Sequence, residues 1–418
     1  MQPIKDNNQI SKMEILFKFN PYESSFQDNP YPIYHKLRSV EPIHQSFNNM
    51  WVVTRYADAK TILRDSRFCV NKMPNHVKYK SDYLGNFNTL AQAISKWLIF
   101  LDPPEHTRLR GLISKAFSAA TVKSLYSQIQ QITEQLISKI RHQGYMDIIA
   151  DFACPLPCNV ICTILGVPVE DWYKLYYWSD KLSEILDPLK SLEDYEQMNK
   201  VALEFIDYFK GLIAQRKINL QQDFLSALIA VKEQNNKLTE EEIISICMLL
   251  FLTGEETTVN LISNGMLALL RHPGQMQQIK TQPMLIQGAI EEILRYDSPI
   301  QITTRVANQD VLLDSVTIQS GDKVLVVLGA ANRDPAQFPE PDRFDITRVN
   351  NNHLAFADGI HSCLGAALTR LEAEIAINAL VQELPDIQLL QEQVEWRKKV
   401  PFRSLKSLPV TFKAMNIT

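Results

Sequence analysis

The chain has 418 residues, 45% of them hydrophobic, which is enough to bury a large core. Its formal net charge of −4 gives no electrostatic footprint for nucleic acid, so we exclude nucleic acid as a partner. No linker, repeat or low-complexity tract divides the sequence, and we predict a single domain over residues 1–418. The amino-terminal segment lacks a basic head followed by an apolar core, and no segment approaches the roughly 18 apolar residues of a membrane span. We therefore expect a soluble, cytoplasmic protein.

Hydrophobic periodicity predicts a fold that is mainly α with a small β portion. The predicted helices cover residues 106–119, 122–142, 157–165, 195–216, 239–271, 284–296 and 364–383. The predicted strands cover 51–55, 316–319 and 324–328. The last two are joined by the turn Ser320-Gly321-Asp322. All three resemble a small sheet, for which residues 408–412 are a further candidate.

Three of the six cysteines, Cys154, Cys158 and Cys162, recur at every fourth position. This spacing would align three thiols on one helical face. Prolines interrupt the start of the stretch and its neighbours are apolar, so we favour small buried residues over a metal cluster. Six cysteines in a chain of this length do not suggest a disulfide scaffold.

The longest predicted helix, 239–271, has a polar centre. Thr239 and Glu242 have the spacing of a capping box, and at 1.5 Å per residue the helix would extend about 48 Å across the core. Residues 254–258 read GEETT between two apolar stretches. Carboxylates and hydroxyls are costly inside an apolar helix unless something there needs them. A solvent-facing stripe with backbone-bonded threonines explains the pattern equally well.

Three further segments follow in chain order. Glu292 and Arg295 share one helical face, although a lone pair of this kind is common on protein surfaces. Residues 332–345, NRDPAQFPEPDRFD, form a loop crowded with prolines, charges and phenylalanines. Residues 356–365, FADGIHSCLG, place Cys363 at the start of a predicted helix.

In this order, these segments resemble the cytochrome P450 family of haem-thiolate monooxygenases, in its bacterial soluble form. The resemblance extends from LDPPEHTRLR at 101–110 to RSLKSLPVTF at 403–412. It implies the P450 fold in one large helical domain, with haem b as the cofactor. By this resemblance Cys363 is the axial ligand of the haem iron. The start of a helix lowers the pKa of a thiol, and thiolate donation favours O–O cleavage.

The resemblance also assigns roles to residues elsewhere in the chain. His106, Arg110, Arg305 and His361 match the positions that contact the haem propionates. Glu292, Arg295 and Arg343 match a buried network that holds the scaffold on the haem side together, which is a structural role.

The catalytic pair implied by the resemblance is Glu256 and Thr257, an acid and an alcohol that deliver protons during oxygen activation. Gly254 would leave space for oxygen. Two positions depart from the family pattern. Thr253 stands where alanine is usual, which affects substrate or water placement, and Ala357 replaces a glycine in a turn where we expect the special φ range of glycine to be unnecessary.

The resemblance implies a monooxygenase that inserts one oxygen atom from O2 into a small apolar substrate. Polyketides, terpenoids, fatty acids and similar secondary metabolites are the candidate substrates. A ferredoxin or flavodoxin with its reductase would supply the electrons. The regions expected to line the pocket are 71–95, 180–195, 300–303 and 402–405. Direct use of hydrogen peroxide, and a haem-binding sensor or carrier without turnover, stay open as alternatives.

Overall fold

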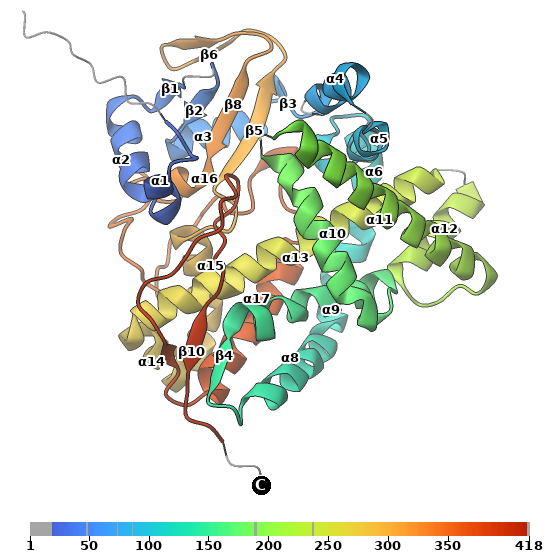
Figure 1. Ribbon diagram of the computed structural model, residues 1–418. Coiled ribbons are helices and arrows are strands. Elements are labelled where there is room, and N and C mark those ends of the chain that lie inside the picture. Colours follow the sequence, from blue (N-terminus) through green and yellow to red (C-terminus); the bar gives the residue numbers. More distant parts are fainter. Residues whose placement is uncertain are drawn as a thin grey trace, which may run out of the picture.

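The computed structural model describes residues 19–415 apart from 47–48, 73, 86, 188–189 and 236–237. Helices make up most of this part of the chain. The largest sheet lies at one end of the helical body, and a smaller sheet lies at the opposite end, near the C-terminus (Figure 1). The predicted fold class, mainly α with a small β portion, is confirmed. That residues 1–418 form one domain stays a prediction.

The helices and strands follow one another along the chain with these bounds. The α-helices are α1 (Ser24–Asp28), α2 (Tyr31–Val40), α3 (Tyr56–Arg64), α4 (Asn75–Leu84), α5 (Asn88–Ile94), α6 (Glu105–Ile113), α7 (Ala119–Ser124), α8 (Tyr126–Ile140), α9 (Pro155–Leu165), α10 (Trp172–Ser183), α11 (Leu192–Ile218), α12 (Phe224–Asn235), α13 (Glu240–Arg271), α14 (Pro273–Thr281), α15 (Ile286–Tyr296), α16 (Leu328–Ala331) and α17 (Ala366–Glu383). Short 3₁₀ or π elements are η1 (Leu98–Phe100), η2 (Ser114–Phe117), η3 (Ile148–Ala153), η4 (Val169–Asp171), η5 (Glu184–Leu186), η6 (Pro283–Leu285) and η7 (Gly359–His361). The strands are β1 (Ile43–Gln45), β2 (Trp51–Val53), β3 (Phe68–Cys69), β4 (Tyr145–Asp147), β5 (Ile302–Ala307), β6 (Val311–Leu313), β7 (Val316–Ile318), β8 (Lys323–Val327), β9 (Gln388–Leu389) and β10 (Pro409–Thr411).

Each predicted helical segment contains a helix, but the boundaries differ. The segment predicted at 122–142 is divided between α7 and α8, and the one predicted at 106–119 ends in the 3₁₀ turn η2. The sequence analysis missed α10 and α12, which lie between predicted helices. Their apolar residues enter a shared core with α11 and α13, so tertiary packing stabilises them.

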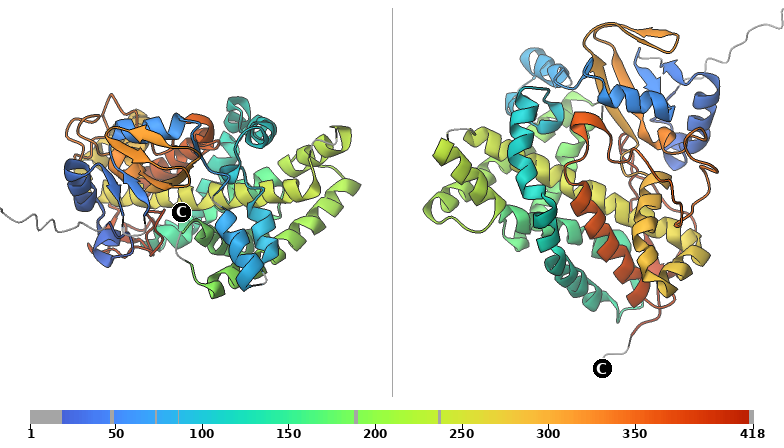
Figure 2. Two further views of the ribbon diagram at one scale, coloured as in Figure 1. Left: turned by 90° about the horizontal axis from the view of Figure 1, so that it is seen from above. Right: turned by 180° about the vertical axis from the view of Figure 1, so that it is seen from behind.

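Helix α13 runs through the middle of the molecule, as the two further views also show (Figure 2). The predicted capping box is confirmed, because the Thr239 side chain accepts from the N–H of Glu242 (3.2 Å) and the Glu242 carboxylate accepts from the N–H of Thr239 (2.8 Å). Residues on all sides of the helix are buried over most of its length, which is typical of a central core helix. The polar GEETT segment therefore lies deep inside the protein.

The strands pair only partly as predicted. The largest sheet has the order β1-β2-β8-β5-β3, whereas β7 pairs with β6, and β10 pairs with β4 and β9. The prediction that 51–55 and 324–328 share a sheet is confirmed, because β2 pairs with β8. The prediction that 316–319 and 408–412 belong to the same sheet is wrong. Most of β8 is buried, as expected for a central strand between β2 and β5. The turn at Gly321 (φ +94°) joins β7 to β8 along the chain but does not pair the two strands.

One described segment, Ile148–Leu165, is long and apolar enough to cross a membrane, contrary to the expectation that no segment approaches this length. In the fold, 72% of it is buried, so here it forms part of the core. Cys154, Cys158 and Cys162 lie in it and are buried, and no cluster suited to hold a metal ion occurs among the described residues. The prediction of small buried cysteines is confirmed.

Candidate functional site

The loop before α17 holds Cys363 in a defined position. The N–H of Cys363 donates to the carbonyl of Phe356 (2.9 Å), and the Asp358 carboxylate accepts from the N–H of Gly359 (2.7 Å). All six cysteines lie in the described part of the chain, and only Cys363 is exposed. It is therefore the one thiol that a bound group could reach.

The surroundings of the Cys363 thiol differ from expectation. Although the side chain is accessible, protein atoms crowd around it, and this burial raises the pKa of the thiol. The N–H of Gly365 and the charges of Arg110 and Arg370 act in the opposite direction but do not outweigh burial. Helix α17 begins only at Ala366, three residues later, so its dipole lies farther away than the sequence suggested. The lowering expected from the start of the helix is thus present but is outweighed by burial.

Ala357 lies in the same loop and has a left-handed backbone (φ +56°). This region costs an L-residue with a Cβ atom roughly 1–2 kcal/mol, whereas glycine enters it freely. The expectation that the special φ range of glycine is unnecessary at this position is therefore wrong. The loop keeps its shape with a strained alanine at the turn.

Four basic side chains predicted to act together do lie together. The rings of His106 on α6 and His361 in the cysteine loop are 4.4 Å apart between centroids. From α6, Arg110 donates to the carbonyl of Ser362 (2.8 Å). Arg305 on β5 is close enough to His361 to lower the pKa of that histidine. The site thus joins three segments that are far apart in the sequence.

The positive charge of this cluster is poorly compensated. The pKa of His361 falls to about 4, mainly through burial and then through Arg305 and His106. Burial lowers the pKa of Arg305 to about 10, and among the described residues no carboxylate forms an ion pair with its guanidinium. The nearest anion to His361 is Asp102, whose Oδ1 lies 3.5 Å from Nε2. The Nε2 atom of His106 is buried and has no hydrogen-bond partner in the described part.

A second charged network is fully buried. Both oxygens of Glu292 accept from Arg295 at 2.8 Å, and both side chains are 0% exposed. Glu292 also accepts from Arg348 (3.1 Å), from Asn351 (3.1 Å) and from the N–H of Asp345 (2.8 Å). The network joins α15 to the loop that leads to Cys363, which is a structural role.

Arg343, the predicted third member of this network, is not part of it through its side chain. That side chain is 61% exposed and pairs with Glu340 at 3.2 Å. Only its carbonyl takes part, by accepting from Arg295 (3.1 Å). Arg348 supplies the second guanidinium instead. Both arginines lie in the same loop, and only its folded path decides which of them turns inward.

In the middle of α13, Thr253, Gly254 and Thr257 are half-buried between buried neighbours. The Thr257 hydroxyl donates to the carbonyl of Thr253 (2.9 Å), so both threonines are bonded along the helix. A Cβ atom at Gly254 would lie 3.4 Å from the Ile161 side chain of α9, so Ile161 packs next to this position. That it leaves space for oxygen stays a prediction.

Glu256, the other half of the predicted pair, turns away from solvent and is 4% exposed. Its Oε1 lies 2.7 Å from Nζ of Lys399, which also binds Asp180 (2.9 Å) and donates to Ser183 (2.8 Å). Burial lowers the pKa of Lys399, but Glu256 and Asp180 together raise it above its ordinary value. Asp180 lies at the start of the predicted pocket region 180–195, whereas Lys399 lies outside every predicted site region. The basic run WRKKV at 396–400 was the available signal.

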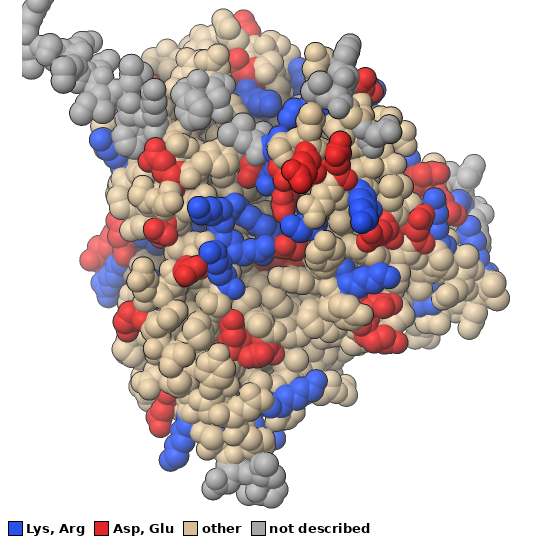
Figure 3. Space-filling model, in the orientation of Figure 1, with Lys and Arg blue, Asp and Glu red and all other residues tan. Residues whose placement is uncertain are grey.

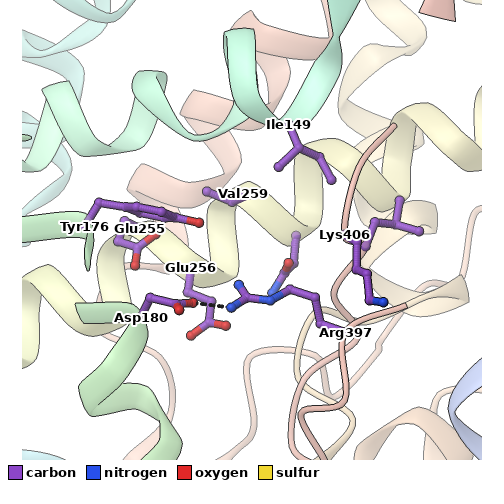
Figure 4. Close-up of a pocket in the computed structure, with 10 residues that line it drawn as sticks. Ile149, Tyr176, Asp180, Glu255, Glu256, Val259, Arg397 and Lys406 are labelled. Atoms are coloured by element: carbon purple, nitrogen blue, oxygen red, sulfur yellow. Dashed lines mark hydrogen bonds and ion pairs between the residues drawn. The ribbon is translucent and has the colours of Figure 1, made fainter. Parts of the chain in front are cut away.

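A polar cavity of about 190 Å³ lies beside this ion pair. Figure 4 shows Glu255 and Glu256 on the same side of α13 as Tyr176, Asp180 and Arg397. The cavity lies between α10, α13 and the carboxyl-terminal segment 396–406.

The family model for cytochrome P450 matches residues 16–283 and 275–398. The chain belongs to the cytochrome P450 family. The biotin biosynthesis cytochrome P450 of Bacillus subtilis is 43% identical over 93% of this chain and 98% of that protein. The polyketide biosynthesis cytochrome P450 PksS of the same organism is 36% identical over 94% of this chain and 98% of its own length.

A solved structure gives the same result. P450BioI in complex with acyl carrier protein ligated to hexadec-9Z-enoic acid aligns with a TM-score of 0.88 and 43% identity, covering 93% of this chain and all of that one. The protein is thus a cytochrome P450 monooxygenase, and the family implies a haem cofactor.

The residues of the site fit a haem. A haem carries two carboxylates, and the cluster of Arg305, His106, Arg110 and His361 has buried positive charge and an unpartnered ring nitrogen that such carboxylates would satisfy. Cys363 supplies the accessible sulfur that a P450 needs.

Proposed function

We propose that this protein binds haem b through Cys363 as the axial ligand of the iron, with His106, Arg110, Arg305 and His361 at the propionates. The observation that carries this proposal is the single exposed thiol beside a buried, poorly compensated cationic cluster. Glu292 and Arg295, joined by Arg348 in place of Arg343, hold the supporting loop.

The haem supplies the oxygen chemistry, and the side chains of this chain supply its protons. The Glu256 carboxylate would relay a proton, and Thr257 offers a hydroxyl one residue later on α13. In the resting arrangement, Lys399 holds the carboxylate and the carbonyl of Thr253 holds the hydroxyl. Both groups must leave these partners to pass a proton to each other.

The proposed reaction inserts one oxygen atom from O2 into a long-chain fatty acyl group presented by an acyl carrier protein. The support is the identity of 43% with P450BioI, whose solved structure contains such a group. A polyketide chain is the second candidate because PksS is 36% identical. Of the predicted pocket regions, 300–303 and 402–405 do meet, since Ile300 and Phe402 form a β-bridge.

A ferredoxin or flavodoxin with its reductase is the proposed electron source, and the cytoplasm is the proposed location. Turnover with substrate and NADPH is expected only when such a donor is added. Equal turnover with hydrogen peroxide alone would favour the peroxide-using alternative. Haem binding without any product would favour a sensor or carrier.

The haem proposal is tested by the absorption spectrum of the reduced protein with carbon monoxide. The wild type should show the red-shifted Soret band of thiolate ligation, and Cys363→Ala should lack it. Cys69→Ala is the matched control, since Cys69 is a buried thiol in β3, and this variant should keep the band. A red-shifted band in Cys363→Ala would show that another residue is the ligand.

The substrate proposal is tested by the shift of the haem spectrum on titration with free hexadecenoic acid and with the same acid tethered to acyl carrier protein. Tighter binding of the tethered acid is expected. No shift with either form, together with a shift on adding a polyketide lactone, would favour the second candidate.

A further inference from the structure

Three buried polar atoms of residues that line the cavity beside α13 have no protein partner among the described residues. They are Oε2 of Glu255, Oε2 of Glu256 and the side-chain nitrogen of Asn260, and none of them has a hydrogen-bond partner among the described residues. The three side chains are 0%, 4% and 3% exposed. A buried polar atom without a partner is unfavourable, so these atoms require water.

The cavity has room for that water. Its volume is about 190 Å³, and at ~30 Å³ per molecule it accepts roughly six waters. Glu255, Glu256 and Asn260 lie on one helix and can bond to the same cluster. Protons can therefore move between the two carboxyl groups through hydrogen-bonded water.

The two neighbouring carboxyl groups have different surroundings. Glu256 forms an ion pair with Lys399 at 2.7 Å. Glu255 accepts only from the Ser179 hydroxyl (2.9 Å), and no cation forms an ion pair with it in the described part of the chain. Burial, followed by the neighbouring Glu256, raises the pKa of Glu255 well above its ordinary value. One carboxyl therefore has a bound cation, whereas burial favours the neutral form of the other.

The other end of the cavity reaches the surface. Lys406, one of the lining residues, has a side chain that is 54% exposed, and that of Arg397 is 30% exposed. Arg397 binds Asp180 at 2.6 Å across this end. Figure 3 shows basic side chains gathered near the middle of this face, where the carboxyl-terminal segment crosses it in Figure 1. Water at this end can exchange with solvent.

We propose that Glu255 stores a proton and passes it through the cavity water to Glu256 during turnover. The proton leaves Oε2 of Glu255, and a proton arrives at the carboxylate of Glu256, so the pair keeps its total charge. Glu256 then gives this proton towards Thr257, and Glu255 regains one from solvent past Arg397 and Lys406. The inference rests on the proposed function, in which Glu256 and Thr257 are the proton-carrying pair and Glu255 has no role.

The first test does not depend on turnover. The infrared spectrum of the haem-loaded protein at neutral pH should contain the carbonyl stretch of a protonated carboxylic acid, with a shift in D2O. Glu255→Gln should remove this signal. Glu372→Gln serves as a reference, because Glu372 is another buried acid whose pKa burial raises, to about 8, and this variant identifies the part of the signal that comes from Glu372. If Glu255→Gln leaves the protonated-acid signals unchanged, Glu255 stores no proton and the inference is wrong.

The second test measures turnover with the electron donor added. Glu255→Gln should lower kcat on the order of 10²-fold, the lower end of what a positioned proton-transfer group contributes. It should also increase the solvent isotope effect, because proton supply becomes limiting. Glu255→Asp keeps an acid at this place and should recover part of the rate. Unchanged kcat and isotope effect in Glu255→Gln would overturn the inference.

The carbon monoxide spectrum separates the two possible failures. A Glu255→Gln protein that keeps the red-shifted band is folded around its haem, so its kinetics test the proton store alone. A wild-type protein without that band would instead remove the proposed function on which the inference rests.

Discussion

Two polar regions of this molecule balance their charges in opposite ways. Around Cys363, the cations Arg305 and Arg110 are partly or fully buried, and no carboxylate forms an ion pair with Arg305 among the described residues. Around Glu256, the carboxylates of Glu256 and Asp180 are matched by Lys399 and Arg397 at 2.6 to 2.9 Å. The first region is incomplete without an anionic group, whereas the second is a closed network beside a polar cavity.

This difference shows what each region requires. An uncompensated buried cation is costly, so its presence points to a partner that the protein itself does not supply. A network whose charges are paired needs no such partner. Water is sufficient to satisfy its remaining unpaired polar atoms. The cofactor belongs to the first region and proton supply to the second.

The largest effect is expected at Thr257, which follows Glu256 on α13. Thr257→Ala should leave NADPH oxidation running while the product formed per NADPH falls by about 10²-fold, because the hydroxyl that positions the proton is lost. Product, peroxide and NADPH should be measured in one reaction with the electron donor added. Thr258→Ala is the matched control, since the Thr258 hydroxyl faces Gly254 and Glu372. A fully coupled Thr257→Ala enzyme would mean that Thr257 is only a helix residue.

The structural network on the Cys363 side gives the next effect. Glu292→Ala should lower the free energy of unfolding by roughly 3–5 kcal/mol, because Arg295 would be left buried and unpaired. Denaturant unfolding followed by circular dichroism measures this loss. Arg343→Ala, the predicted but exposed member, should change stability by no more than about 0.5 kcal/mol. An equal loss of unfolding free energy in the two variants would show that the Arg343 side chain belongs to the network.

Glu372 on α17 predicts a pH dependence. Burial raises its pKa from 4.5 to about 8, so between these values the folded protein holds a proton that the unfolded chain has lost. The free energy of unfolding should therefore fall as pH rises through this window. Glu372→Gln should remove this fall and be more stable at pH 8 by a few kcal/mol, at most about 5. The midpoint of thermal unfolding from pH 5 to 8 checks it, and parallel curves for both proteins would contradict it.

The smallest effect is expected at Ala357. Ala357→Gly should raise the free energy of unfolding by about 1 kcal/mol, because glycine relieves the left-handed backbone. Ala355→Gly is the control, since Ala355 lies outside the left-handed region and glycine there should destabilise by roughly 0.5–1 kcal/mol. Denaturant unfolding compares both with the wild type. A loss of stability in Ala357→Gly would show that the methyl group contributes packing that outweighs the strain.

Much of the architecture could be read from local patterns. The polar centre of α13 and its capping box were visible because helical periodicity and caps depend on neighbours within a few residues. The sheet partners of β7 and β10 could not be predicted, because strand pairing joins residues that are far apart in the chain. The same limit applies to Arg343 and Arg348, which lie in one loop and differ only in the direction that the folded chain gives them.

By itself, the sequence determined the family, the ordered motifs and the residues that meet around Cys363, because residue identity at fixed spacing carries chemical information. Only the tertiary structure decided the left-handed turn at Ala357, the ion pair of Glu256 with Lys399 and the cavity shared with Glu255. Backbone dihedrals, burial and cavity volume depend on packing between segments more than a hundred residues apart. No local pattern encodes them.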